Sequence, residues 1–276
     1  MAGSGKAHMR PEGDRILEVN DLTVEFNLGR GKVVKAVSGI SLDLIRGETL
    51  AIVGESGCGK STLGKAILQL PKPTSGSVNF LSKELTTMNK HDLREMRPAM
   101  QMIFQDPFAS LNPRMRVEDI IGEAPRIHGL VSAAETSDYV DDVMKKVGLD
   151  PSLKKRYAHQ FSGGQRQRIG IARALAVKPK FLVCDEAIAA LDVSIQAQVI
   201  NLFMDLRTEL GLTYLFISHD LSVVEHIADR VAIMYLGRIV ESAPTEEIFA
   251  NPRHPYTKAL LAEAPRLDQR QRVFEP

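Results

Sequence analysis

The stretch that decides the fold of this chain is Thr49-Leu50-Ala51-Ile52-Val53-Gly54-Glu55-Ser56-Gly57-Cys58-Gly59-Lys60-Ser61. Its apolar first part predicts a buried strand, and the pattern of residues 61–70 predicts a helix. Residues 54–61 fit the spacing G-x-x-x-x-G-K-[ST], in which glycines let backbone N–H groups turn toward phosphates. A chance glycine turn is the alternative, and the strand before the loop and the helix after it count against that alternative.

This loop predicts that the chain binds a nucleoside triphosphate. The helix start at 60–62 adds positive partial charge, Lys60 would reach the β- and γ-phosphates, and the Ser61 hydroxyl would coordinate Mg²⁺. The predicted nucleotide contacts of the loop are Gly54, Glu55, Ser56, Gly57, Cys58, Gly59, Lys60, Ser61 and Thr62. The loop alone does not indicate what the energy is used for.

A second motif suits the same chemistry and reads Phe181-Leu182-Val183-Cys184-Asp185-Glu186. Its apolar residues predict a strand that delivers Asp185 to its C-terminal end, where ligands bind in parallel sheets. Asp185 would hold Mg²⁺ directly or through water, and Glu186 could orient and deprotonate the attacking water. An acidic pair that merely closes a surface strand is the alternative, and the phosphate loop in the same chain disfavours it.

A third motif, Phe161-Ser162-Gly163-Gly164-Gln165, opens a predicted helix over 166–177. A serine and two glycines at a helix start make a second possible anion site. An ordinary N-cap with flexible glycines explains the same residues equally well.

The order of strands and helices predicts an α/β protein. Residues 16–44 contain four short β-like segments, at 16–19, 22–26, 33–37 and 40–44, which indicate an antiparallel start. Apolar residues at helical spacing within 117–148 predict a mostly helical insertion. Strands and helices then alternate, as in a parallel sheet covered on both faces, over 180–184, 194–210, 213–217, 221–228 and 231–235.

Composition narrows the class of protein. The 276 residues include 35 Lys and Arg against 34 Asp and Glu, and this near balance argues against a nucleic-acid-wrapping protein. The longest apolar stretches, at 181–184 and 212–217, are far shorter than a membrane span. No N-terminal export signal is recognisable, and the two cysteines cannot form a disulfide framework, so we expect a reducing cytosol.

Together these motifs resemble those of the ATP-binding subunit of an ABC transporter. Residues 162–165 resemble the signature motif of that family, and the motifs follow the family's order from Phe26 to about Pro265. Three more segments are similar to its Q-loop, D-loop and switch histidine, namely Gln105 in 103–107, Leu191-Asp192, and His219 in 217–220. The resemblance implies a P-loop NTPase fold with a RecA-like core, an N-terminal antiparallel β subdomain and a helical insertion subdomain.

The resemblance also implies roles for single residues. Phe26 would stack on adenine, or else pack in the core as a strand residue. Gln105 would touch the Mg²⁺ or the water and face the membrane partner, or else be a solvated glutamine. His219 would contact the γ-phosphate, or else begin a helix. Asp192 would cross a dimer interface, or else cap a helix. Ser162, Gly163, Gly164 and Gln165 would bind the nucleotide held by the other subunit.

Three segments are similar to the oligopeptide, dipeptide and nickel import branch: 105–113, 191–198 and the His-Pro-Tyr stretch 251–260. Two features depart from that branch. Ala187 stands where a proline usually follows the glutamate, and no cysteine follows Cys184. Because Glu186 is kept we expect ATP hydrolysis, and because the cysteines are missing we expect no iron–sulfur cluster.

The expected function is the ATP-hydrolysing subunit of a bacterial importer, with peptides as the first candidate cargo. Nickel, opines or sugar conjugates remain alternatives, as does a soluble ABC ATPase; an exporter ATPase is disfavoured by the His-Pro-Tyr element. We expect this chain to pair head to tail with a second ATP-binding subunit, either identical or related. Two transmembrane permeases are the other expected direct partners, and a substrate-binding protein is an indirect one. No nucleic-acid partner is expected. The chain would lie on the cytoplasmic face of the membrane.

We expect a disordered lead at 1–14, an ABC nucleotide-binding domain at 15–266 and a tail at 267–276. Within the domain, the core and β subdomain would cover 15–107 and 178–241, the helical subdomain 108–177 and the His-Pro-Tyr element 242–266. A helix of the transmembrane subunit would dock near 105–115, on an exposed apolar patch that includes Phe108, Leu111 and Met115.

Overall fold

The computed structural model describes residues 14–29, 31–106 and 110–263, so the expected lead and tail lie outside the described residues except for Asp14. The chain forms two compact units. The first consists of Met1–Met88 and Leu215–Pro276, and the second of Asn89–Tyr214.

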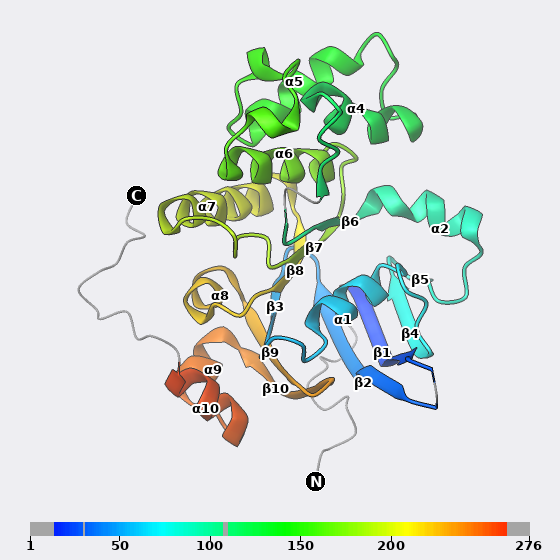
Figure 1. Ribbon diagram of the computed structural model, residues 1–276. Coiled ribbons are helices and arrows are strands. Elements are labelled where there is room, and N and C mark those ends of the chain that lie inside the picture. The colour runs from blue at the N-terminus through cyan, green and yellow to red at the C-terminus, as the bar shows by residue number, and fades with distance from the viewer. Residues whose placement is uncertain (1–13, 30, 107–109, 264–276) are drawn as a thin grey trace. The chain divides into compact units, whose positions relative to one another are not determined.

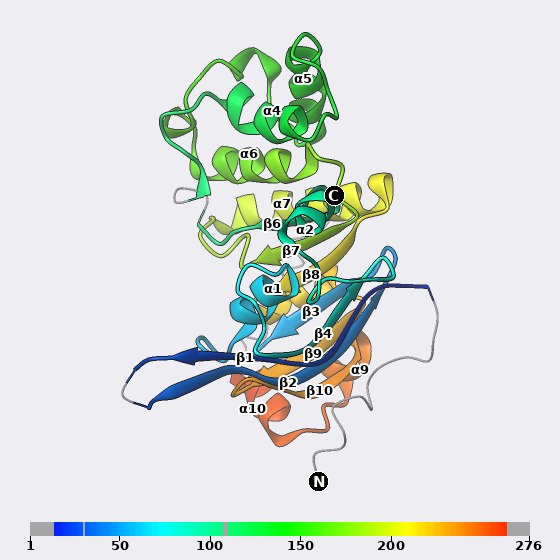
Figure 2. The same ribbon diagram turned by 90° about the vertical axis from the view of Figure 1, so that its right-hand side faces the viewer.

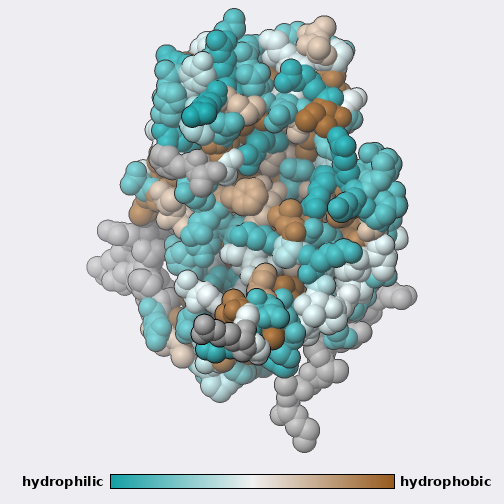
Figure 3. Space-filling model, turned by 45° about the vertical axis from the view of Figure 1, so that its right-hand side comes forward, coloured by the Kyte–Doolittle hydropathy of each residue, from teal (hydrophilic) through white to brown (hydrophobic). Residues whose placement is uncertain are grey.

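Within the described ranges, no helix is long and apolar enough to cross a membrane. On the face in Figure 3, hydrophobic residues lie in separate groups between hydrophilic ones.

The first unit contains an antiparallel sheet with the order β2-β1-β4-β5. Its strands are β1 (Arg15–Asn27), β2 (Val33–Ile45), β4 (Ser75–Phe80) and β5 (Lys83–Glu84). Figure 2 shows the long strands β1 and β2 running side by side.

The expected four short segments at 16–44 are two long strands, and this part of the prediction was wrong. The polar pair Asn20-Asp21 does not end β1, because a shift in register between Val19 and Leu22 accommodates it. Asp21 adopts a φ of 47°, and its backbone N–H donates to the Ser41 hydroxyl at 2.9 Å. The polar residues therefore mark an irregularity within a strand.

The strands that lead to the phosphate loop lie in the same unit. β3 (Thr49–Val53) pairs in parallel with β9 (Arg230–Tyr235), and β10 (Arg238–Pro244) pairs antiparallel with β9. The end of β8 (Thr213–Ile217) lies beside β3, where the Ser218 N–H donates to the Ile52 carbonyl at 3.3 Å.

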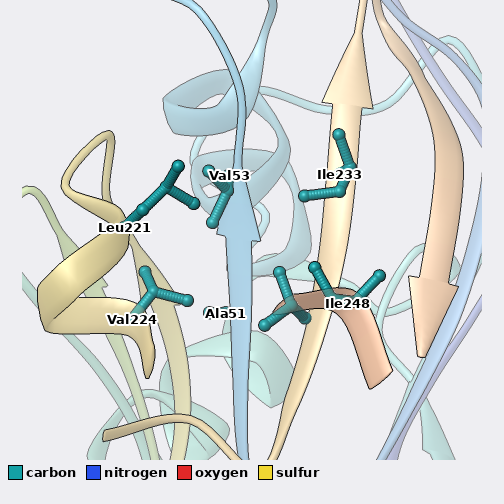
Figure 4. Packing of buried hydrophobic residues seen from close by; sticks show 7 residues of the cluster. Ala51, Val53, Leu221, Val224, Ile233 and Ile248 are labelled. Atoms are coloured by element: carbon teal, nitrogen blue, oxygen red, sulfur yellow. The ribbon is translucent and has the colours of Figure 1, made fainter. Parts of the chain in front are cut away.

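Among the described residues of this unit, the helices are α1 (Lys60–Ile67), α8 (Leu221–Ile227), α9 (Thr245–Ala250) and α10 (Pro255–Glu263). A buried cluster joins α8 and α9 to β3 and β9 (Figure 4), with Ala51, Val53, Leu221, Val224, Val231, Ile233 and Ile248. Tyr256, Leu260 and Leu261 of α10 pack against this cluster. The strand that ends at the phosphate loop is thus anchored by the C-terminal helices.

The second unit contains two parallel strands and most of the helices. β6 (Met100–Ile103) pairs with β7 (Phe181–Asp185), with Ile103 opposite Cys184. The helices are α2 (Lys90–Met96), α4 (Val117–Ile127), α5 (Thr136–Lys146), α6 (Gly163–Leu175) and α7 (Val193–Leu210). Figure 1 shows α4, α5 and α6 packed together. The expected helical character of 117–148 is confirmed by α4 and α5.

Candidate nucleotide-binding site

The phosphate loop joins β3 to α1, and its backbone lies directly against neighbouring strands. A Cβ atom at Gly54 would lie 2.1 Å from the Met234 carbonyl oxygen, and one at Gly59 would lie 2.1 Å from the Ala36 carbonyl oxygen. Gly59 also has a φ of 109°, which side chains rarely allow. Only glycine therefore fits at these two positions.

Lys60 is buried within this loop, with 4% of its surface exposed. Its Nζ donates to the carbonyl oxygens of Gly54 and Glu55 at 2.7 and 2.8 Å. Burial raises the pKa of the neighbouring Cys58 thiol, although the Lys60 charge opposes the shift. Cys58 is therefore neutral at neutral pH, and the Lys60 Nζ lies 4.0 Å from its sulfur.

Two contacts to the loop come from the C-terminal part of the chain, and the sequence did not predict them. The Gly237 N–H donates to the Cys58 carbonyl at 3.0 Å, and the Glu55 N–H donates to the Tyr256 hydroxyl at 3.1 Å. The His-Pro-Tyr element is the only sequence signal that could have pointed to the second contact. The element that marks the import branch thus touches the phosphate loop.

Phe26 and His219 belong to the same unit as the loop. Phe26 lies near the end of β1 with 42% of its surface exposed, so the alternative of a core residue is wrong. His219 is exposed between β8 and α8. Asp220, not His219, caps α8, since its carboxylate accepts the N–H of Ser222 at 3.0 Å.

Gln105, Asp185 and Glu186 belong to the second unit, at the C-terminal ends of β6 and β7. Because these strands are parallel neighbours, Gln105 and Glu186 meet: the Gln105 Nε2 donates to the Glu186 carboxylate at 2.7 Å. Asp185 ends β7 with 3% of its surface exposed. Glu186 has a φ of 48°, which is uncommon for a residue with a side chain.

The turn after Glu186 lacks the proline usual in the import branch. Ala187 and Ile188 are buried in its place. The Ala189 N–H donates to the Glu186 carbonyl and the Leu191 N–H to the Ile188 carbonyl, both at 3.1 Å. Burial and hydrogen bonds therefore hold the turn.

The signature segment begins α6. The Gln165 N–H donates to the Ser162 hydroxyl at 3.3 Å, and the Ser162 N–H donates to the Gln165 side-chain oxygen at 3.1 Å. This reciprocal pair is a capping box, so the N-cap interpretation describes Ser162 correctly. It does not explain Gly163, because a Cβ atom there would meet nothing within 4 Å. Packing requires a small residue only at Gly164, which lies against Ile195.

Asp192 occupies the start of α7 and is exposed. It is the N-cap residue of the helix, so the helix-cap alternative describes its position correctly. Its backbone carbonyl accepts the N–H groups of Ile195 and Gln196 at 2.9 and 2.8 Å, whereas its side chain makes no capping hydrogen bond. The carboxylate of Asp192 therefore takes no part in capping the helix.

The expected exposed apolar patch near 105–115 is not seen among the described residues of this segment. Leu111 is only 3% exposed, and Met115 is partly buried; Phe108 lies outside the described residues. Arg173 of α6 donates to the Ser110 carbonyl at 2.6 Å, and a His159 ring nitrogen lies 3.2 Å from the Pro113 carbonyl oxygen. These contacts hold the segment against the subdomain and bury Leu111.

Replacing Lys60 with alanine is expected to weaken ATP binding by about 10- to 100-fold, the range for a hydrogen bond to a charged group. Fluorescent-nucleotide titration would measure the loss, and circular dichroism would establish that the variant is folded. The matched control is Lys65→Ala, which removes another lysine of α1. An unchanged ATP affinity in the folded Lys60→Ala chain would contradict the phosphate role.

Comparison with known proteins gives the family. Residues 37–189 match the model for "ABC transporter", and residues 240–276 match "Oligopeptide/dipeptide transporter, C-terminal region". The chain is 53% identical to the oligopeptide transport ATP-binding protein OppF of Salmonella typhimurium, over 91% of this chain and 78% of that one. It is 50% identical to the dipeptide transport ATP-binding protein DppF of Lactococcus lactis, over 96% and 88%.

Solved structures of ABC ATP-binding proteins are also similar to this chain. CbiO1 of Clostridium perfringens, part of an ABC transporter complex, matches with a TM-score of 0.75 and 31% identity, over 87% of this chain and 92% of that one. The ATP-binding cassette MJ0796, a dimer bound to ADP and phosphate, matches with a TM-score of 0.75 and 26% identity, over 83% and 98%. The expected P-loop NTPase fold is confirmed, and the chain belongs to the ATP-binding proteins of the ABC transporter family.

Proposed function

We propose that this chain is the ATP-hydrolysing subunit of an importer for peptides. The observation that carries the proposal is its identity of 50 to 53% with proteins named for oligopeptide and dipeptide transport, over more than nine-tenths of the chain. The match at 240–276 to the C-terminal region of the same transporters supports the same branch.

The proposed roles in ATP binding and hydrolysis fall on residues in each of the two units. In the first, residues 54–62 would surround the phosphates, Lys60 would neutralise them, Phe26 would stack on adenine and His219 would contact the γ-phosphate. In the second, Glu186 would orient the attacking water and accept its proton. The hydrogen bond from Gln105 at 2.7 Å is compatible with this role, because a carboxylate has about four acceptor lone pairs and can accept from the amide and from the water at the same time.

Magnesium suits the oxygen donors of this site. Over the described residues, no cluster of three or more His, Cys, Asp or Glu could form an all-protein metal cage. Mg²⁺ commonly binds through one or two carboxylates together with substrate phosphates, so such a cage is unnecessary. Ser61, Gln105 and Asp185 would hold the ion, and the bound ion would offset phosphate charge.

The open space beside Gly163 and the exposed side chain of Asp192 support a proposed dimer. Gly163 and Asp192 are available to a partner, and two subunits placed head to tail would let Ser162–Gln165 of one complete the pocket of the other. The similar cassette MJ0796 is dimeric, which supports the pairing of two such subunits. Two membrane permeases and a substrate-binding protein would complete the importer at the cytoplasmic face of the membrane.

The experiment is to co-express this chain with the permeases encoded beside it and to purify it from detergent-solubilised membranes. The permeases should co-purify, and a peptide-loaded binding protein should stimulate ATP hydrolysis of the complex. Lys60→Ala is the control, because it should remove hydrolysis and leave co-purification unchanged. Recovery of the chain only from the soluble fraction, with no membrane partner, would contradict the proposal.

A further inference from the structure

The His-Pro-Tyr element reaches the phosphate loop through one hydroxyl group. The Glu55 N–H donates to the Tyr256 hydroxyl oxygen at 3.1 Å, and both residues belong to the first unit. We propose that Tyr256 is a positioning residue for ATP: its hydroxyl fixes the Glu55 peptide, so that the C-terminal region supports the nucleotide site. This inference rests on the proposed phosphate-binding role of residues 54–61.

The ring of Tyr256 is itself held on two sides. It packs with Leu260 and Leu261 of α10 against the cluster that contains Ala51 and Val53 of β3, the strand that leads into the loop. On its other side it lies against Tyr235 at the end of β9, with ring centroids 4.3 Å apart. A ring that packs against the cluster and against Tyr235 has its hydroxyl held where it accepts the Glu55 N–H.

The turn before Tyr256 is also fixed. The two carboxylate oxygens of Glu241 in β10 accept the N–H groups of Arg253 and His254 at 2.8 and 2.9 Å. Burial acts to raise the pKa of Glu241, but the hydrogen bonds that it accepts outweigh burial and lower it. Glu241 is therefore charged at neutral pH, and it anchors the start of α10 to the sheet.

Lys60 shows why the hydroxyl matters for nucleotide binding. Its Nζ donates to the carbonyl oxygens of Gly54 and Glu55 at 2.7 and 2.8 Å. The peptide group between Gly54 and Glu55 is therefore held at its carbonyl by Lys60 and at its N–H by Tyr256. When Lys60 turns to the phosphates, it gives up these carbonyls. The Tyr256 hydroxyl then keeps the Glu55 peptide in place, which lowers the cost of ordering the loop around ATP.

Tyr256→Phe removes only the hydroxyl and keeps the ring. We expect ATP affinity to fall by roughly three- to tenfold, the effect of one neutral hydrogen bond. Because Glu55 is held in the same way before and during the reaction, KM for ATP should rise while kcat is retained. Tyr235→Phe is the matched control, because over the described residues the structure gives the Tyr235 hydroxyl no hydrogen-bond partner.

The test is ATP titration of the full chain by calorimetry, steady-state ATPase kinetics of the assembled transporter, and amide hydrogen exchange of residues 54–56. Weaker binding, a raised KM and faster exchange in Tyr256→Phe alone would support the inference. Wild-type affinity, a loss confined to kcat, or an equal loss in Tyr235→Phe would overturn it. Lys60→Ala, measured in parallel, distinguishes failure of the proposed phosphate loop from failure of the proposed role of Tyr256. If Lys60→Ala binds ATP normally, the phosphate role of the loop is contradicted. If Lys60→Ala is impaired and Tyr256→Phe is not, only the role of Tyr256 is contradicted.

Discussion

Glu186→Gln should lower the rate of ATP hydrolysis by about 100- to 10,000-fold, the contribution of a general base, while ATP still binds. Glutamine has the same shape and its side-chain oxygen can still accept from the Gln105 amide, as Glu186 does at 2.7 Å. It cannot take up a proton from water. The substitution therefore removes the proposed chemistry and preserves the hydrogen bond that holds residue 186.

The measurement is single-turnover hydrolysis of ATP by the assembled complex, with ATP affinity determined on the same preparation. Glu209→Gln, at an exposed carboxylate of α7, is the matched control and should behave as wild type. Wild-type turnover in Glu186→Gln would exclude Glu186 as the base. Loss of ATP binding together with turnover would instead indicate a role in holding the nucleotide.

Gly163→Asp should abolish ATP-driven pairing of the subunits and leave each subunit able to bind ATP through its own loop. A Cβ atom at residue 163 meets nothing within 4 Å, so the subunit itself can accommodate a side chain. In the proposed dimer that side chain would face the γ-phosphate of the partner. Two like charges about 4 Å apart cost about 4 kcal/mol at an effective dielectric constant of about 20, which is close to a 1000-fold effect.

Gly163→Asn is the matched control, because it has the size of aspartate without the charge. Analytical ultracentrifugation with ATP should show the aspartate variant as a monomer and a smaller effect of asparagine. ATP titration of the Gly163→Asp monomer shows whether the signature segment contacts the nucleotide of the partner or the nucleotide of its own subunit. If the folded Gly163→Asp monomer loses ATP affinity outright, the signature segment serves its own nucleotide and the head-to-tail proposal fails.

Local patterns predicted the elements that carry the motifs. The strand at 49–53, the helix of residues 194–210 and the strand at 213–217 agree with β3, α7 and β8 to within one residue. In each case a continuous apolar stretch or a helical repeat is bounded by glycine or polar residues. The whole of β10 was missed, because its residues are only partly buried and show no alternation.

Contacts between distant residues were not predictable from the sequence. The bond between Glu55 and Tyr256 joins residues 201 positions apart, and its existence depends on how α10 packs on β3. The buried Leu111 likewise follows Ser110, whose carbonyl accepts from Arg173, 63 positions away in the chain. Local pattern identified the chemistry of the motifs, whereas packing decided which side chains support them.

ATP hydrolysis by this chain is expected to drive the import of peptides. Uptake of a radiolabelled tripeptide into proteoliposomes that hold the assembled transporter tests it most directly. ATP is supplied on the side of this chain, and the binding protein with peptide on the other. We predict uptake that requires ATP, is competed by unlabelled peptides, and falls to background with Glu186→Gln. Peptide uptake that persists in that variant, or ATP-driven uptake of nickel ions with none of peptide, would contradict the account.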